Sequence, residues 1–189
     1  MTTVLTVPNT PSAPALLLRP WRDDDVPALT EMDPDDGLRR WTTFPGGSAD
    51  EIQRWVTAQH AGRETGDRIS FAVVEAVREA VEEEVREAAP EKPLGYVVLK
   101  LRDSIGEVGY WTAPQARGRN LAARALDALC RWAFGEHPHL THLELIHQVD
   151  NHASCRVAAK SGFALSQVLP PHPPWPLEGH LHVRRNPLG

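Results

Sequence analysis

Residues 114–134, PQARGRNLAARALDALCRWAF, join a polar turn to a long amphipathic segment. Apolar residues recur in this segment at the spacing of one helix face: Leu121, Ala125, Leu129 and Trp132. The periodicity predicts a helix over residues 117–134. Arginine, glycine and asparagine fill residues 117–120, directly before the apolar stripe. The first N–H groups of a helix lack intrahelical acceptors and the helix dipole favours negative charge there, so the stretch predicts an anion-binding turn.

Strand and helix patterns alternate through the rest of the chain. Runs rich in β-branched and apolar residues predict strands at residues 16–19, 69–76, 94–101, 104–114, 140–148, 164–169 and 179–185. Helix starts are predicted at Asp23–Asp25, where carboxylates favour the dipole, at the capping box of Ser48 and Glu51, and at Asn151. The order of elements predicts one α/β domain with helices against a central sheet.

Composition and charge exclude several classes of protein. The chain of 189 residues suits one domain, and its formal net charge of -5 comes without a basic stripe, which argues against a nucleic-acid partner. No apolar run is long enough to span a membrane, and the N-terminus lacks the pattern of a signal peptide. We expect a cytoplasmic protein with a disordered tail at residues 1–14, a single domain at residues 15–189, and an acidic insertion without a chemical role at residues 76–92.

Cysteine and histidine patterns argue against a metal site. Cys130 and Cys155 each fall in a predicted helix without metal or redox spacing, so we expect buried thiols. Four histidines lie close together in the sequence: His137, His139, His142 and His147. They cross from a loop into a strand, without an i, i+4 helical pair or nearby cysteines, so we expect no metal.

Two blocks resemble signatures of the GNAT superfamily of N-acetyltransferases. The turn QARGRN at residues 115–120 fits the family's Q/R-x-x-G-x-G/A motif, with Asn120 where glycine is more common. The block DNHASCRVAAKSGF at residues 150–163 is similar to the family's N-x-x-S segment, and LLLRPWRDDD at residues 16–25 resembles the RimJ/RimL-like branch. The resemblance covers about residues 15–185. It implies a fold that contains both helices and strands (α/β, or α+β in the stricter classification). The expected central sheet is mixed and mostly antiparallel, has about seven strands and is flanked by four helices.

The resemblance also implies a binding site for acetyl-CoA. Its pyrophosphate cradle is the helix start, formed by Arg117, Gly118, Arg119, Asn120, Leu121 and Ala122. In the family the preceding strand splays from the next one, and its backbone binds the pantetheine arm. That role falls to Tyr110, Trp111 and Thr112, with simple core packing as the other interpretation of Trp111. Asn151 and Ser154 would face the cofactor from the other side.

Acetyl transfer needs a neutral amine and a proton donor for the departing thiolate. Many family members use a tyrosine as the donor, but that position is Ala158 here, so Ser154 becomes the candidate acid, with a local helix cap as the other interpretation. Strand alternation places Glu107 on one face with Trp111, which makes Glu107 the candidate base; an ion pair on the strand is an equal alternative. His147 and a water relay stay open as other routes for the proton.

We therefore expect an acetyl-CoA-dependent N-acetyltransferase that works by direct attack in a ternary complex. The acceptor is a primary amine, either a protein or peptide N-terminus, as in the RimJ/RimL-like branch, or a small molecule. Trp41, Phe44 and the loop at residues 169–180 are expected to wall the acceptor site. The alternative is a non-catalytic acyl-CoA-binding module with a sensing or regulatory role, which Ala158 and Asn120 favour. A homodimer is one option for the assembly.

Overall fold

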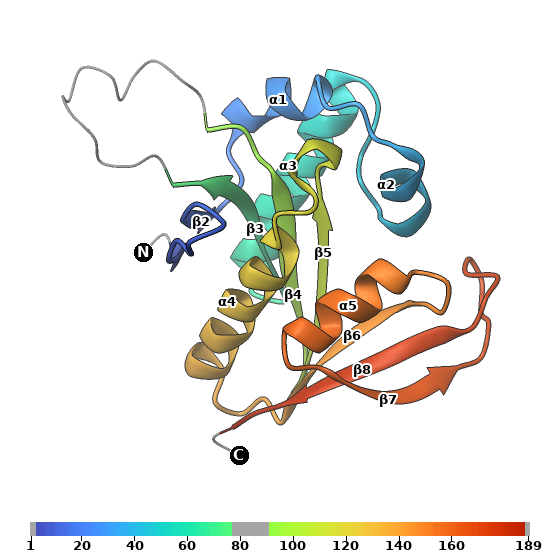
Figure 1. The fold of residues 1–189 in the computed structure, drawn as a ribbon. Coiled ribbons are helices and arrows are strands. Elements are labelled where there is room, and N and C mark those ends of the chain that lie inside the picture. Colours follow the sequence, from blue (N-terminus) through green and yellow to red (C-terminus); the bar gives the residue numbers. More distant parts are fainter. Residues whose placement is uncertain (1–2, 77–90, 188–189) are drawn as a thin grey trace.

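The computed structural model describes residues 3–76 and 91–187. Over these residues, eight strands form one sheet in the order β1-β2-β3-β4-β5-β6-β8-β7 (Figure 1). The strands are β1 (Leu5–Val7), β2 (Leu16–Arg19), β3 (Arg68–Glu75), β4 (Gly95–Arg102), β5 (Ile105–Thr112), β6 (His142–Gln148), β7 (Ala164–Leu169) and β8 (Gly179–Arg185). Every neighbouring pair is antiparallel except β5 and β6, which run parallel. The predicted mixed, mostly antiparallel sheet is confirmed.

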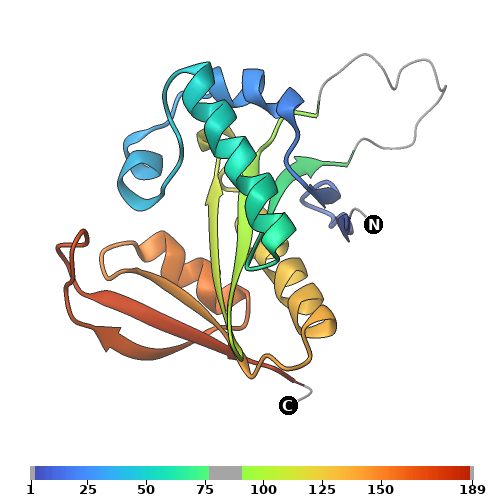
Figure 2. The same cartoon turned by 180° about the vertical axis from the view of Figure 1, so that it is seen from behind.

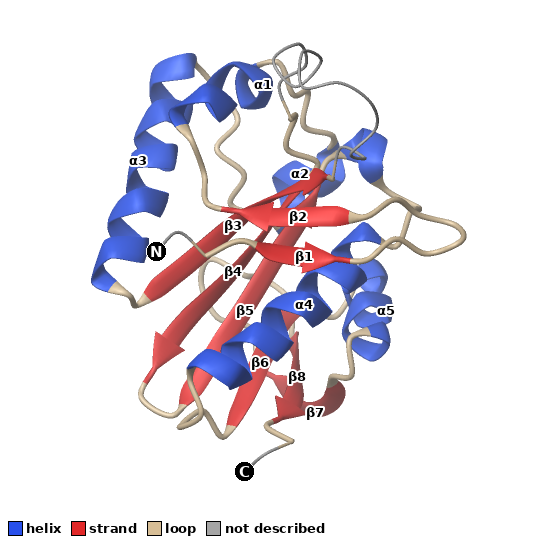
Figure 3. Cartoon of the chain, turned by 90° about the vertical axis from the view of Figure 1, so that its left-hand side faces the viewer, coloured by secondary structure: helices blue, strands red, loops and turns tan. Residues whose placement is uncertain are grey.

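Five α-helices accompany the sheet in the described part of the chain. They are α1 (Val26–Thr30), α2 (Asp36–Trp41), α3 (Ala49–Thr65), α4 (Leu121–Glu136) and α5 (His152–Lys160). Seen from behind, α3 crosses one face of the sheet (Figure 2), and from the side α3 and α4 lie on opposite faces (Figure 3). None of the helices in the described ranges is long and apolar enough to cross a membrane.

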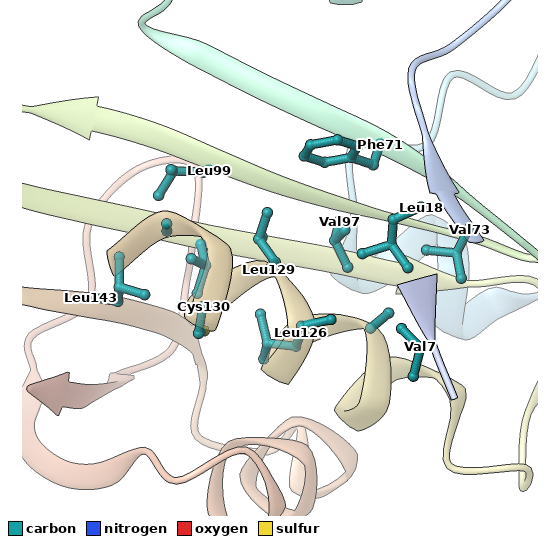
Figure 4. Close-up of a cluster of buried hydrophobic side chains, with 14 of the residues drawn as sticks. Val7, Leu18, Phe71, Val73, Val97, Leu99, Leu126, Leu129, Cys130 and Leu143 are labelled. Carbon is teal, nitrogen blue, oxygen red and sulfur yellow. The ribbon is translucent and has the colours of Figure 1, made fainter. Parts of the chain in front are cut away.

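The face under α4 holds the larger hydrophobic cluster. Its apolar stripe packs on alternating residues of the neighbouring strands, and Figure 4 shows Leu126, Leu129 and Cys130 pointing toward Val97 and Leu99. Cys130 is fully buried, as expected for a packing thiol, and burial raises its pKa to about 12. Because the apolar face of α4 is packed on the sheet, the position of the helix also determines the position of the turn that precedes it.

The face under α3 is aromatic. Trp111 of β5 stacks on Tyr96 of β4, with ring centroids 5.9 Å apart, and Trp21 and Trp55 pack around them. Trp111 is only 4% exposed, so its side chain is core while its backbone belongs to β5. Such tilted and edge-on aromatic contacts add specific geometry to the burial of apolar area.

The structure corrects several predicted boundaries. The helix predicted over residues 117–134 is α4 at Leu121–Glu136, and the strand predicted over residues 104–114 ends at Thr112. Residues 3–14 are not a disordered tail, because Leu5–Val7 pair with β2 and Val7 is buried under α4. The sheet therefore begins with β1, which raises the strand count of the described residues from seven to eight. The short α2 was missed and raises the helix count from four to five; its N-cap is Asp35, whose side chain accepts from Leu38 N. The expected acidic insertion at residues 76–92 lies outside the described residues over 77–90.

A buried ion pair fixes the entry to the first helix. Arg19, at the end of β2, donates to both carboxylate oxygens of Asp25, at 2.8 and 2.7 Å, and their side chains are 4% and 3% exposed. Asp25 also accepts from the backbone N–H of Arg22. Removing one member of such a pair leaves a buried charge without its partner.

We expect Asp25→Ala to lower the free energy of unfolding by about 3 kcal/mol, because it removes the buried partner of the Arg19 guanidinium and leaves Glu91, which is 27% exposed, as its remaining carboxylate partner. Urea denaturation measures this change. The matched control is Asp24→Ala, one residue earlier and exposed, which should change stability by less than about 0.5 kcal/mol. Equal losses from the two substitutions would contradict the assignment.

Candidate active site

The parallel strands β5 and β6 part in the middle of the sheet. They pair only from Ile105 with His142 to Val108 with Leu145. Beyond that point β5 continues beside β4 to Thr112, whereas β6 continues beside β8. The two strands diverge visibly in Figure 1. Residues 109–112 of β5 therefore turn one backbone edge toward the gap, as expected from the resemblance.

A cavity of about 480 Å³ occupies the gap and its mouth. Tyr110 of β5 lines it on one side and Ser154 and Asn151 of α5 on the other. Trp41 and Trp175, two of the residues predicted to wall an acceptor site, also line this cavity. The cavity does not reach Phe44, which instead packs edge-on against Trp111.

The turn before α4 has the backbone of an anion cradle. Gly118 and Asn120 both adopt left-handed conformations, with φ of 77° and 55°. Asparagine tolerates this region better than most residues, so the turn survives without a second glycine. Asn120 is the N-cap of α4, yet its side chain makes no capping hydrogen bond and accepts instead from Lys160 Nζ at 3.3 Å. The first N–H groups of α4, from Leu121 onward, thus receive no side-chain cap.

The two arginines of the turn already have acidic partners. Arg117 binds both carboxylate oxygens of Asp35, and its Nη2 lies 2.8 Å from Oδ1. This contact with Arg117, followed by the backbone N–H of Leu38, lowers the pKa of Asp35. Arg119 pairs with Glu75 at the end of β3. Arg117 therefore ties the turn to α2, and both guanidinium groups are about half exposed.

Helix α2 is held across the mouth of the cavity. Besides the Arg117 contact at its N-cap, Arg40 near its C-terminus pairs with Asp150, at 2.6 Å, just before α5. Trp41, the last residue of α2, lies under the Arg40 guanidinium and lines the cavity. Helix α2 is thus tied at one end to the turn before α4 and at the other to the residue that precedes the N-cap of α5.

Ser154 is one of two hydroxyl groups that meet inside the gap. Tyr110 donates to Ser154 Oγ at 2.9 Å, from the opposite wall. Asn151 caps α5 by accepting from Ser154 N at 3.1 Å, which fixes the first turn of the helix. Burial raises the pKa of Tyr110 to about 12, so its phenol keeps its proton at neutral pH. Ala158, where many family members have their tyrosine, is fully buried in the core.

The two candidate bases are engaged by other groups. Glu107 lines the cavity but pairs with Lys100 and, at 3.0 Å, with Arg102, which is the ion-pair alternative considered above. His147 also lines the cavity, and burial lowers its pKa, which favours the neutral ring. Its Nδ1 donates to Gln148 O, and its Nε2 faces His182.

Comparison with known proteins decides the family. The GNAT acetyltransferase domain matches residues 15–164. This chain belongs to the GNAT acetyltransferase family. No curated protein matches it.

The solved structures similar to this GNAT chain include ribosomal-protein acetyltransferases. RimL, a ribosomal L7/L12 alpha-N-protein acetyltransferase in complex with coenzyme A, has a TM-score of 0.76 and 16% identity, over 97% of this chain and 99% of that one. Mycobacterium smegmatis RimJ has a TM-score of 0.73 and 18% identity, over 97% of this chain and 86% of that one. MccE, a microcin C7 self-immunity acetyltransferase in complex with acetyl-CoA and AMP, has a TM-score of 0.75 and 14% identity, over 93% of this chain and 97% of that one. The predicted GNAT fold and its RimJ/RimL-like resemblance are confirmed.

Sequence reasoning missed the Tyr110 hydroxyl in this GNAT chain. Tyr110 was assigned only through its backbone, although strand alternation puts its side chain on the face opposite Glu107 and Trp111. That face meets α5, where Ser154 lies. The available signal was therefore the alternation itself, combined with a donor missing at Ala158.

Both tyrosines of the chain, Tyr96 and Tyr110, have pKa values raised to about 12 by burial, against 10.0 for a free phenol. The folded state therefore holds its phenolic protons longer than the unfolded state does. The resulting stability is fully present below about pH 10 and is lost as the pH rises through about 12.

We expect the native protein to show no tyrosinate absorbance step near pH 10. A pH titration in the near ultraviolet, with circular dichroism to follow the fold, measures this. The urea-unfolded chain is the control and should ionise near pH 10. A tyrosinate step at that pH with the native dichroism intact would show that the phenols are not shielded.

Proposed function

We propose that this chain is an acetyl-CoA-dependent N-acetyltransferase of the cytoplasm that acetylates a primary amine by direct attack in a ternary complex. The observation that carries the proposal is a cavity lined by two features, the unpaired backbone edge of β5 and the hydroxyl pair of Tyr110 and Ser154. The left-handed turn before α4, whose first N–H groups have no side-chain cap, is the third feature that supports it.

The cofactor half of the proposal rests on backbone chemistry. A pyrophosphate needs several N–H donors, and the start of α4 from Leu121 supplies them with the helix dipole behind. Gly118, with open space around its Cα, allows close approach. The amide-bearing pantetheine arm can pair with the edge of residues 109–112, and the Thr112 hydroxyl there is buried without a partner among the described residues. The coenzyme A and acetyl-CoA complexes of RimL and MccE support this assignment.

The hydroxyl pair supplies the acid side of the reaction. Because Ser154 Oγ accepts from Tyr110, its own O–H is free to point at another acceptor. The amine nitrogen attacks the thioester carbon, the carbon–sulfur bond breaks, and the thiolate receives a hydrogen bond from Ser154. The amine gives up one proton and the sulfur takes one, so the proton count balances.

The base side favours an α-amine as acceptor. Glu107 is held by two cations, and His147 is turned toward His182, so neither is presented to the acceptor as a free base. An α-amino group, with a pKa of about 7.7–8.0, is partly neutral at physiological pH, whereas a lysine at about 10.4 is not. A protein or peptide N-terminus or a weakly basic small amine therefore needs only water to take up its proton. The structural similarity to RimL, a ribosomal L7/L12 alpha-N-protein acetyltransferase, is consistent with this acceptor class.

Removing the hydroxyl pair should slow turnover more than it weakens binding. We expect Ser154→Ala to lower kcat by about 10²-fold or more with a smaller change in acetyl-CoA affinity, because the donor acts on the leaving sulfur. Tyr110→Phe should lower kcat in the same direction. Ser166→Ala on the exposed side of β7 is the matched control. Steady-state kinetics with equal rates for wild type and Ser154→Ala would remove Ser154 from the mechanism.

The cradle is tested by a pair of glycines. Gly118→Val should weaken acetyl-CoA binding by at least about tenfold, because valine disfavours the left-handed backbone that aims the α4 amides. Gly66→Val is the control, since Gly66 has φ of 79° and open space around it but caps α3 away from the cavity. It should cost similar stability without changing affinity. Calorimetric titration that finds unchanged affinity for Gly118→Val would misplace the cradle.

The whole proposal is tested by titrating the protein with acetyl-CoA and then screening thiol release across small amines and N-terminal peptides. Binding followed by release on an amine establishes the enzyme and its acceptor class. Binding without release on any acceptor favours the acyl-CoA-binding module instead. Absence of binding overturns both.

A further inference from the structure

Three histidines lie on one face of the β6–β8 ladder. His147 and His180 are direct cross-strand partners, and His182 lies two residues along β8 from His180, on the same face. Helix α5 reaches this face and brings Cys155 to His180, with Sγ 3.4 Å from Nδ1. Of the four histidines that lie close together in the sequence, only His147 belongs to this group.

The four side chains are spaced as a coordination shell would be. One ligand atom from each of His147, Cys155, His180 and His182 lies within 4.8 Å of all the others. In a tetrahedral zinc site, with bonds of about 2.0–2.3 Å, neighbouring ligand atoms are roughly 3.3–3.8 Å apart. The pair of His147 and His182, at 3.1 Å between Nε2 atoms, and the pair of Cys155 and His180, at 3.4 Å, are already close to that spacing. The remaining separations need only small side-chain movements.

Proton positions point the same way. His147 Nδ1 must be protonated, because its partner Gln148 O only accepts, so in the neutral ring Nε2 carries a lone pair. That lone pair faces Nε2 of His182, whose side chain belongs to a residue only 6% exposed. The other ring nitrogen of His182, Nδ1, is buried without a partner among the described residues. His182 Nε2 can donate its proton to this lone pair, or in the other tautomer it carries a lone pair of its own. In that second tautomer a cation shared by the two rings would satisfy both facing atoms.

The ligand set selects the metal. We propose that His147, Cys155, His180 and His182 form a zinc site that fastens α5 to β6 and β8. Imidazole nitrogen and thiolate sulfur suit zinc, whereas calcium and magnesium take oxygen ligands, which this set lacks. The carbonyl of Gln148 orients the ring of His147 as outer partners do in metal sites.

The position of the site gives it a structural role. Three histidines and one cysteine fill a tetrahedron, so no coordination position stays open for a substrate. Cys155 directly follows Ser154, and His147 lines the cavity. The metal would thus fix the position of α5, which carries Ser154. This structural role does not depend on whether the protein acetylates an acceptor.

The test uses tag-free protein depleted of metal with a chelator, titrated with Zn²⁺ by calorimetry and with Co²⁺ by absorption. Wild type should bind one equivalent per chain and unfold at a higher temperature with Zn²⁺. Its Co²⁺ form should show intense visible bands of tetrahedral geometry and a thiolate-to-cobalt band in the near ultraviolet. These readouts do not depend on acetylation, so they are separate from the fate of the proposed function.

Variants locate the site. Cys155→Ser should abolish the thiolate band, and both it and His182→Gln should weaken Zn²⁺ binding by more than about 100-fold. His152→Gln, an exposed histidine on the same helix, should bind as wild type does. The proposal is overturned if wild type binds no Zn²⁺, if its Co²⁺ spectrum lacks the thiolate band, or if Cys155→Ser and His152→Gln bind Zn²⁺ alike. The first two of these outcomes need no variant and stand even if a variant misfolds.

Discussion

The parting of β5 from β6 after Val108 is the constraint on which the rest of the structure depends. Peptide groups inside a sheet normally pair on both edges, and an unpaired buried group is costly. Here α4 packs over the paired part of both strands, and α5 reaches β8 through Cys155 and His180. The gap beyond Val108 is a cavity whose walls are backbone on one side and helix on the other. Its chemistry follows from what these two walls bring together, chiefly Tyr110 and Ser154.

Charge around the cleft is balanced within the protein itself. Arg117 and Arg119 have carboxylate partners, and so have Lys100 and Arg102 at the other end of the cavity. In the proposed function, a polyphosphate bound at this turn would meet guanidinium groups that are already engaged, and the backbone amides at the start of α4 would bear more of its recognition. Such a site would not need an excess of basic residues, in line with the net charge of -5.

Local patterns in the sequence predicted the elements that depend on local interactions. The capping box at Ser48, the apolar stripe of α4 and the cap at Asn151 appear where they were expected. The strand at Leu5–Val7 was missed because three residues give too short an alternation to separate a strand from a tail. Likewise, α2 depends on its cap at Asp35 more than on periodicity. The position of Gly118 and Asn120 before a helix also followed from the sequence.

The contacts that were not predicted are those between distant segments. Tyr110 and Ser154 are separated by 44 residues, and His147 and His182 by 35. Neither separation in sequence belongs to a recognisable motif. The first pair depends on which face of β5 meets α5, and the second depends on the register of β6 with β8. The ion pairs that engage Glu107 depend in the same way on the β4–β5 register, which places Lys100 opposite it.

The distribution of tryptophans has an optical consequence. Trp41 and Trp175 stand on the cavity walls and are partly exposed, whereas Trp21 and Trp111 are packed in the aromatic cluster. Indole emission responds to the polarity around the ring, and the partly exposed Trp41 and Trp175 lose more contact with water when the cavity fills than the buried Trp111, which also lines it. The molecule therefore carries an intrinsic fluorescent reporter in the wall of its cavity.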